Sequence, residues 1–185
     1  MDDPGRRSEG LSRAAGRRPV IGVMGASAAS PATLELARTL GRLIAEAGWV
    51  VLTGGRPAGV MEAASAGARS VAGGLTVGIL PSGPEGPVSP QVDLAIFTGI
   101  GEARNAINVL SSDVVIACGV EGPGTASEVA LALRLGRPTV LLAPALSAAA
   151  FFREIAGETT LHQASTAEAA IDLIEHRFGI RRWPG

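Results

Sequence analysis

The stretch Cys118-Gly-Val-Glu-Gly-Pro-Gly-Thr-Ala-Ser-Glu128 organises the rest of the chain. It follows an apolar run, residues 114–117, that is typical of a fully buried strand, and it opens an apolar-periodic segment, residues 125–136, that predicts a helix. A glycine-rich turn therefore joins a strand to a helix. Gly122 and Gly124 let a ligand approach the backbone closely, and the free N–H groups of a helix start favour an anion. This stretch predicts a phosphate-binding loop.

The same residues fit a second interpretation that needs no ligand. Thr125 and Glu128 have the spacing of a capping box, in which the two side chains satisfy the free N–H groups of the helix start. A capping box explains Thr125 and Glu128, but it does not explain two glycines within the three preceding residues. Both interpretations stay open at the level of sequence.

Strands and helices alternate along the whole chain. Central strands are expected at residues 19–25, 49–53, 75–80, 93–98, 114–117 and 139–142, with a short edge strand at 159–161. Helices are expected between them and at the end, at residues 31–47, 60–71, 102–110, 125–136, 148–156 and 166–178. Parallel strands need crossover helices on both faces of the sheet. The pattern predicts a doubly wound α/β fold, Rossmann-like, with a mostly parallel sheet flanked by helices.

A second glycine-rich turn, residues 54–59, follows the second strand, and two such turns in one small domain favour an anion site built from two loops. In doubly wound sheets ligands bind beyond the carboxyl ends of the strands, where the loops after the first, second, fourth and fifth strands converge. The first loop lacks the full Gly-x-Gly-x-x-Gly pattern, which argues against NAD. Arg104 follows the fourth strand, and it is either a solvated helix charge or a ligand-binding residue.

The composition narrows the classes of function. The chain has 185 residues, 46% of them hydrophobic, which is enough for one domain with a well-buried core. Its net charge of −1 gives no overall positive charge that would attract nucleic acid. All 16 basic residues are arginine, so a pyridoxal-phosphate Schiff base and a Walker-type lysine are excluded. One cysteine, Cys118, and two histidines make a metal site improbable, and we predict none.

The sequence predicts one domain between two terminal segments. Residues 1–18 are charged and unpatterned and are predicted to be a disordered arm, residues 19–180 form the single nucleotide-binding domain, and residues 181–185 form an exposed tail. No segment has 18 uninterrupted apolar residues, so we expect no membrane span and a cytoplasmic protein.

Three segments together resemble the Lonely Guy (LOG) superfamily of Rossmann-like nucleotide-binding proteins. They are Gly54-Gly-Arg-Pro-Ala-Gly-Val-Met-Glu62, Gly101-Glu-Ala-Arg-Asn105 and Gly122-Pro-Gly-Thr-Ala-Ser-Glu128. Residues 21–142 look like the branch of the superfamily that includes molybdenum-cofactor carrier proteins. Some members were formerly labelled lysine decarboxylases, a chemistry that the missing lysine excludes here.

The resemblance implies two alternative functions for one site. In the phosphoribohydrolase members an arginine and a glutamate act at the N-glycosidic bond of a nucleoside 5′-monophosphate, and by similarity these roles fall to Arg104 and Glu128. In the carrier branch the same loops hold a phosphorylated ligand such as molybdenum cofactor as cargo, with no turnover and no required cofactor. The ligand-binding residues expected in either case are Gly25, Ser27, Gly54, Gly55, Gly59, Met61, Asn105, Gly122, Gly124 and Thr125. The resemblance also implies a homodimer.

One departure from the family pattern concerns the phosphate loop. The hydrolases usually have Pro-Gly-Gly-x-Gly-Thr, whereas this chain has Glu121 where a glycine is expected. A carboxylate beside an anion site repels phosphate unless it points away or pairs with an arginine. The main hypothesis is a phosphoribohydrolase and the alternative is a carrier, with a phosphorylated nucleotide-like ligand common to both.

Overall fold

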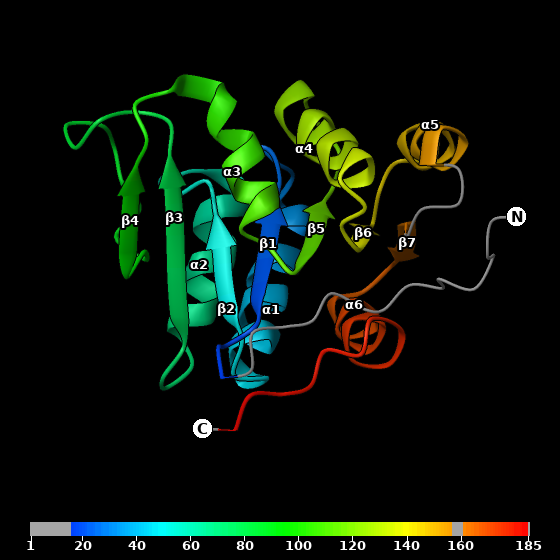
Figure 1. Cartoon of the computed structure of the whole chain (residues 1–185), viewed down its shortest axis with the longest axis horizontal. Helices are drawn as coiled ribbons and strands as arrows, with labels where there is room; N and C mark the ends of the chain where they lie inside the picture. Colours follow the sequence, from blue (N-terminus) through cyan, green and yellow to red (C-terminus); the bar gives the residue numbers. More distant parts are fainter. Residues whose placement is uncertain (1–15, 157–160, 185) are drawn as a thin grey trace, which may run out of the picture.

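The computed structural model describes residues 16–156 and 161–184, and in this part of the chain seven strands form one sheet in the order β4-β3-β2-β1-β5-β6-β7. Every neighbouring pair of strands is parallel. The strand order reverses direction between β1 and β5, which creates the switch point where ligands bind in such sheets. The prediction of a doubly wound, Rossmann-like α/β fold is confirmed (Figure 1).

The strands are β1 Val20–Met24, β2 Val50–Thr53, β3 Leu75–Leu80, β4 Leu94–Phe97, β5 Val114–Cys118, β6 Thr139–Leu142 and β7 Leu161–Ala164. The helices are α1 Pro31–Glu46, α2 Gly59–Arg69, α3 Asn105–Leu110, α4 Pro123–Arg134, α5 Leu146–Ala156 and α6 Ala167–Asp172. A short 3-10 turn, η1 Gly101–Arg104, leads into α3, and a π-helical turn, η2 Leu173–Arg177, continues α6.

Helices cover the two faces of the sheet in two groups of three. Helices α1, α2 and α6 pack on one face around residues such as Ile21, Val51 and Ile116. Helices α3, α4 and α5 pack on the other face, which Figure 1 shows toward the viewer. Strands β1, β2, β5 and β6 are buried on both faces, which explains their uninterrupted apolar sequences.

The closest helix packing lies between α1 and α2, and two glycines make it possible. A Cβ at Gly41 would overlap the carbonyl oxygen of Ala64 on α2, and a Cβ at Gly67 would overlap the carbonyl oxygen of Arg38 on α1. The two backbones therefore touch at reciprocal positions. The sequence pattern predicts both helices, but it gives no sign of this contact.

Several element boundaries differ from the predictions. The edge strand is β7 at Leu161–Ala164 instead of residues 159–161, and residues 157–160 lie outside the described part of the chain. Helix α4 begins at Pro123, two residues before its expected start, because proline suits the first helical position. Helix α5 begins at Leu146.

The C-terminal tail is held against the domain in the part of the chain that the structure describes. The predicted disordered arm falls mostly on residues 1–15, outside the described residues. In the tail, Arg181 and Arg182 are exposed, but Trp183 packs on the core, and its backbone N–H donates to the carbonyl oxygen of Ala47. The carbonyl oxygen of Arg181 accepts a hydrogen bond from the indole of buried Trp49. Within residues 16–156 and 161–184, no helix is both long and apolar enough to cross a membrane.

Candidate functional site

A cavity of about 600 Å³ lies at the carboxyl edge of the sheet, where the loops after β1, β2, β4 and β5 meet. This is the edge toward which the strand arrows point in Figure 1. The lining residues are Val23, Met24, Gly25, Ala26, Ser27, Ala28, Gly54, Arg56, Met61, Glu102, Arg104, Asn105, Glu121, Gly122, Pro123, Gly124, Thr125, Ser127 and Glu128. A volume of this size suits a ligand as large as a mononucleotide.

The cavity brings together all of the predicted site residues except two. Gly55 and Gly59 do not line it. A Cβ at Gly59 would overlap the backbone of Ala26 and Ser27, and Gly55 packs against Gly78 of β3, so both glycines serve the packing of the loops. The roles expected of the residues that do line the cavity stay predictions.

Gly54 makes room for Arg104. A Cβ at Gly54 would overlap the Nη1 atom of Arg104 and would lie 2.8 Å from the sulfur of Met61. The glycine after β2 therefore leaves room for the guanidinium of a turn that is distant in sequence to enter the cavity. This turn is η1, whose last residue is Arg104.

Arg104 is a buried cation whose Nε has no hydrogen-bond partner among the described residues. The residue is only 4% exposed, which rules out the interpretation as a solvated helix charge. Burial lowers the pKa of Arg104, while Glu128 and Glu102 oppose that change by attraction and Arg56 adds to it by repulsion. Arginine stays charged in proteins, so the cavity holds a guanidinium whose Nε–H is buried without a partner among the described residues. Such a group is suited to an anionic ligand.

Glu128 is the second buried charged group of the cavity and is 6% exposed. Its Oε1 accepts a hydrogen bond of 2.8 Å from Nδ2 of Asn108, which is fully buried on α3. Burial raises the pKa of Glu128, and the hydrogen bond from Asn108 and the charge of Arg104 limit that rise. The N-cap of α4 is Gly122, with no side-chain hydrogen bond. The capping-box interpretation of Thr125 and Glu128 is therefore wrong.

The start of α4 offers unpaired backbone donors to the cavity. The first N–H groups of a helix have no partner within the helix, and here no side chain caps them. A Cβ at Gly122 or Gly124 would meet no atom within 4 Å, so the packing of the described protein does not require glycine at either position. The two glycines leave the backbone open toward the cavity, as the close approach of an anion requires.

Glu121 lies beside these donors but is held at a different helix. Its Oε1 accepts a hydrogen bond of 3.0 Å from Oγ1 of Thr33, in the first turn of α1. A negative charge at a helix N-terminus is favoured by the helix dipole. The carboxylate thus pairs with Thr33 and not, among the described residues, with an arginine.

Arg56, Glu102 and Asn108 are polar residues of the site to which the sequence assigned no role. Arg56 and Glu102 line the cavity and form an ion pair of 3.8 Å between the loop after β2 and η1. Asn108 does not line the cavity, but it positions Glu128. The sequence does contain a pattern that points to Asn108. Asn105 and Asn108 are three residues apart on an otherwise apolar helix, so they share one face of that helix.

Replacing Glu128 by glutamine should raise the stability of the protein at pH 7 and not at pH 4. Burial raises the pKa of Glu128 in the folded state above its ordinary value of 4.5. The contribution of Glu128 to stability is therefore complete below pH 4.5, and it is lost as the pH rises through the folded-state pKa. Glutamine does not titrate, and its amide can still pair with Asn108. Urea unfolding at the two pH values tests this, with exposed Glu154→Gln as control. A variant that is less stable than wild type at pH 7 contradicts it.

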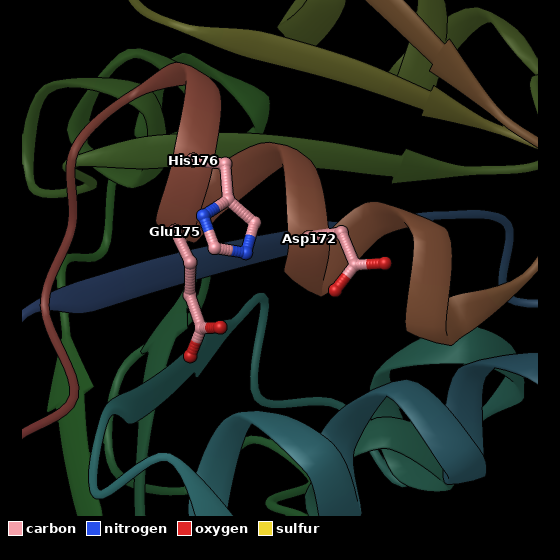
Figure 2. A group of neighbouring side chains, drawn as sticks. All are labelled: Asp172, Glu175 and His176. Carbon is pink, nitrogen blue, oxygen red and sulfur yellow. The ribbon is translucent and has the colours of Figure 1, made fainter.

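A separate group of side chains lies outside the cavity. In the part of the chain that the structure describes, the one group of His and carboxylate side chains close enough to share a metal ion is Asp172, Glu175 and His176, whose ligand atoms lie within 4.8 Å of one another (Figure 2). None of the three lines the cavity. Oε1 of Glu175 already accepts a hydrogen bond of 2.5 Å from Nε of Arg182. The prediction that the protein has no metal site stays a prediction.

Comparison with known proteins gives the family of this chain. The model of the SLOG cluster4 family matches residues 18–171. A protein from Archaeoglobus fulgidus, described only as uncharacterized, is 45% identical over 124 residues, which are 67% of this chain and 80% of that protein.

Solved structures are similar over most of the chain. The molybdenum cofactor binding protein from the phototrophic bacterium Rippkaea orientalis is 54% identical, with a TM-score of 0.82 over 86% of this chain and 96% of that one. The molybdenum cofactor carrier protein from Chlamydomonas reinhardtii is 46% identical, with a TM-score of 0.79 over 88% and 99%. DNA processing protein A from Helicobacter pylori, at 20% identity and a TM-score of 0.62, shares the fold alone.

Proposed function

Because the chain belongs to the SLOG cluster4 family, we propose that it binds a phosphorylated, nucleotide-like small molecule in this cavity and carries it without turnover, with molybdenum cofactor as the cargo. The observation that carries the proposal is Arg104, a buried guanidinium that meets a ligand-sized cavity beside the open start of α4. Two kinds of donor, a fixed cation and free backbone N–H groups, converge there as a phosphate monoester requires. The molybdenum cofactor proteins among the similar structures favour a carrier over a hydrolase.

The test of the proposal is the ligand that the protein retains. Protein purified from cells that make molybdenum cofactor should release molybdenum and a pterin on denaturation, measured by mass spectrometry and by fluorescence after oxidation. Arg104→Met protein prepared in parallel should release neither. Equal amounts from both proteins would show that the cavity does not hold the cargo.

Hydrolysis of a nucleoside 5′-monophosphate is the second candidate, and the observation that favours it is the presence of Arg104 and Glu128 in one cavity. A carboxylate can stabilise an oxocarbenium-like transition state, and a guanidinium can hold the phosphate. Incubation with AMP and prenylated AMP, followed by chromatography of the free base, decides the question. Base release by the wild-type protein that Glu128→Ala abolishes would establish the hydrolase.

We also propose that the protein is a homodimer. Its two copies would pair through the β4 end of the sheet, on the face where α3 packs. Leu94 and Ile96 of β4 are 55% and 41% exposed, and in register Ile96 is paired with Ile79, which packs against α3. No helix in the described part of the chain covers this end of the sheet, although parallel sheets are normally covered on both faces (Figure 1). Leu110 at the end of α3 is 52% exposed. A second copy would cover this apolar surface.

Lysine at both Ile96 and Leu110 should convert the dimer to a monomer, because two charges would then face the partner. Light scattering after size exclusion measures the mass. Leu146→Lys is the matched control, since Leu146 is 90% exposed on α5 and lies outside this surface. A wild-type monomer, or a dimer that only Leu146→Lys disrupts, contradicts the assignment.

A further inference from the structure

The cavity contains more carboxylates than cations, and a phosphate alone does not account for them. Glu102, Glu121 and Glu128 line it together with Arg56 and Arg104. Two of the carboxylates have partners in the protein. Glu102 forms an ion pair with Arg56, and Glu121 accepts a hydrogen bond from Thr33 of α1. The third, Glu128, is buried and accepts one hydrogen bond, from Asn108, at Oε1. A ligand that offered only acceptors would leave this buried carboxylate without a partner for its second oxygen.

We propose that Glu128 recognises the hydrogen-bond donor edge of a 2-amino-4-oxopyrimidine ring, the edge shared by guanine and pterins, while Arg104 and the start of α4 hold the phosphate of the same ligand. This inference rests on the proposed function and adds to it the residue that recognises the ring and the edge of the ring that it binds. In such a ring a protonated nitrogen lies beside the exocyclic amino group, so two parallel N–H groups point the same way. A carboxylate only accepts hydrogen bonds, and its two oxygens match this pair of donors.

Adenine lacks this pair of donors. Its exocyclic amino group lies beside a ring nitrogen that accepts a hydrogen bond, so one oxygen of the carboxylate would face a lone pair. Rejection of a ligand that leaves a buried polar group unpaired is strong, whereas shape alone discriminates weakly. The position of Glu128 is set by Asn108 through a hydrogen bond of 2.8 Å. The carboxylate is therefore held in place before any ligand arrives, which discrimination requires.

Sugar hydroxyls are the other donors that Glu128 could bind, and ribose 5-phosphate separates the two cases. The dissociation constants of GMP, AMP, 6-hydroxymethylpterin phosphate and ribose 5-phosphate are measured by calorimetry on the full chain. The wild-type protein should bind GMP and the pterin phosphate roughly tenfold or more tightly than AMP. Glu128→Gln should lose or reverse this preference, because a glutamine amide both donates and accepts and so matches adenine. Glu154→Gln on α5, outside the cavity, should keep it.

The outcomes separate the two proposals. Equal affinities for GMP, the pterin phosphate and AMP overturn the assignment of Glu128, and the proposed function stands if Arg104→Met weakens all three. An equal loss of GMP, AMP and ribose 5-phosphate in Glu128→Gln, with the affinity for the sugar-free pterin phosphate unchanged, shows that Glu128 binds the sugar and also overturns it. If no phosphate ester binds and no pterin is released on denaturation, the proposed function fails, and the inference fails with it.

Discussion

Replacing Arg104 by methionine should lower the affinity for a phosphorylated ligand by about 100-fold and leave the empty protein as stable as the wild type. Truncation of one partner of a buried, hydrogen-bonded charge pair costs roughly 2–5 kcal/mol of binding free energy. Arg104 as a residue is 4% exposed, and its Nε has no hydrogen-bond partner among the described residues, so its burial already costs stability when the cavity is empty. Methionine fills the same space without this cost.

A loss of binding without a loss of stability is what distinguishes a ligand-binding arginine from a structural one. If Arg104 only supported the fold, its loss would lower the free energy of unfolding, and ligand affinity would follow. We expect Arg104→Lys to keep part of the affinity, since it retains the charge but loses the planar pair of donors. The matched control is Arg134→Met in the last turn of α4, which is exposed and should change neither quantity. Calorimetry and urea unfolding of the same preparations measure both.

The location of the site could be predicted from the sequence because it depends on topology. Strand-to-helix turns rich in glycine follow β2 and β5, and in a parallel sheet all such turns lie at one edge. Arg104 follows β4 in the same way. The order of the elements alone thus brings Arg104 and Glu128 to one cavity, although the sequence separates them by more than twenty residues.

The hydrogen bonds within the site could not be predicted, because they depend on how each helix is rotated about its axis. The spacing of Thr125 and Glu128 fits a capping box, yet Glu128 turns instead toward Asn108 on α3. In the same way Glu121 pairs with Thr33 of α1, 88 residues away. Such rotations follow from the packing of whole helices on the sheet, and the local pattern does not encode them.

Valine at Gly41 should have the largest effect on the fold, a loss of about 3 kcal/mol in the free energy of unfolding. Overpacking of a close contact costs roughly 1–3 kcal/mol and at times more, and here the added Cβ would overlap a backbone carbonyl of α2, which cannot rotate away as a side chain can. Gly67→Val should cost a similar amount, because its Cβ would overlap the carbonyl oxygen of Arg38 on α1. Urea unfolding measures both variants.

The double variant should lose less than the sum of the two single losses, because both substitutions push apart the same pair of helices and neighbouring changes are not additive. Gly124→Val is the matched control, since Gly124 is also helical but a Cβ there meets no atom within 4 Å. Its stability should stay within about 0.5 kcal/mol of the wild type, as for surface substitutions. A loss at Gly124 equal to that at Gly41 would mean that the contact between α1 and α2 does not set the cost, because this contact is absent from α4 and valine is a better helix former than glycine. Equal stability of Gly41→Val and wild type would show that the two helices can separate freely.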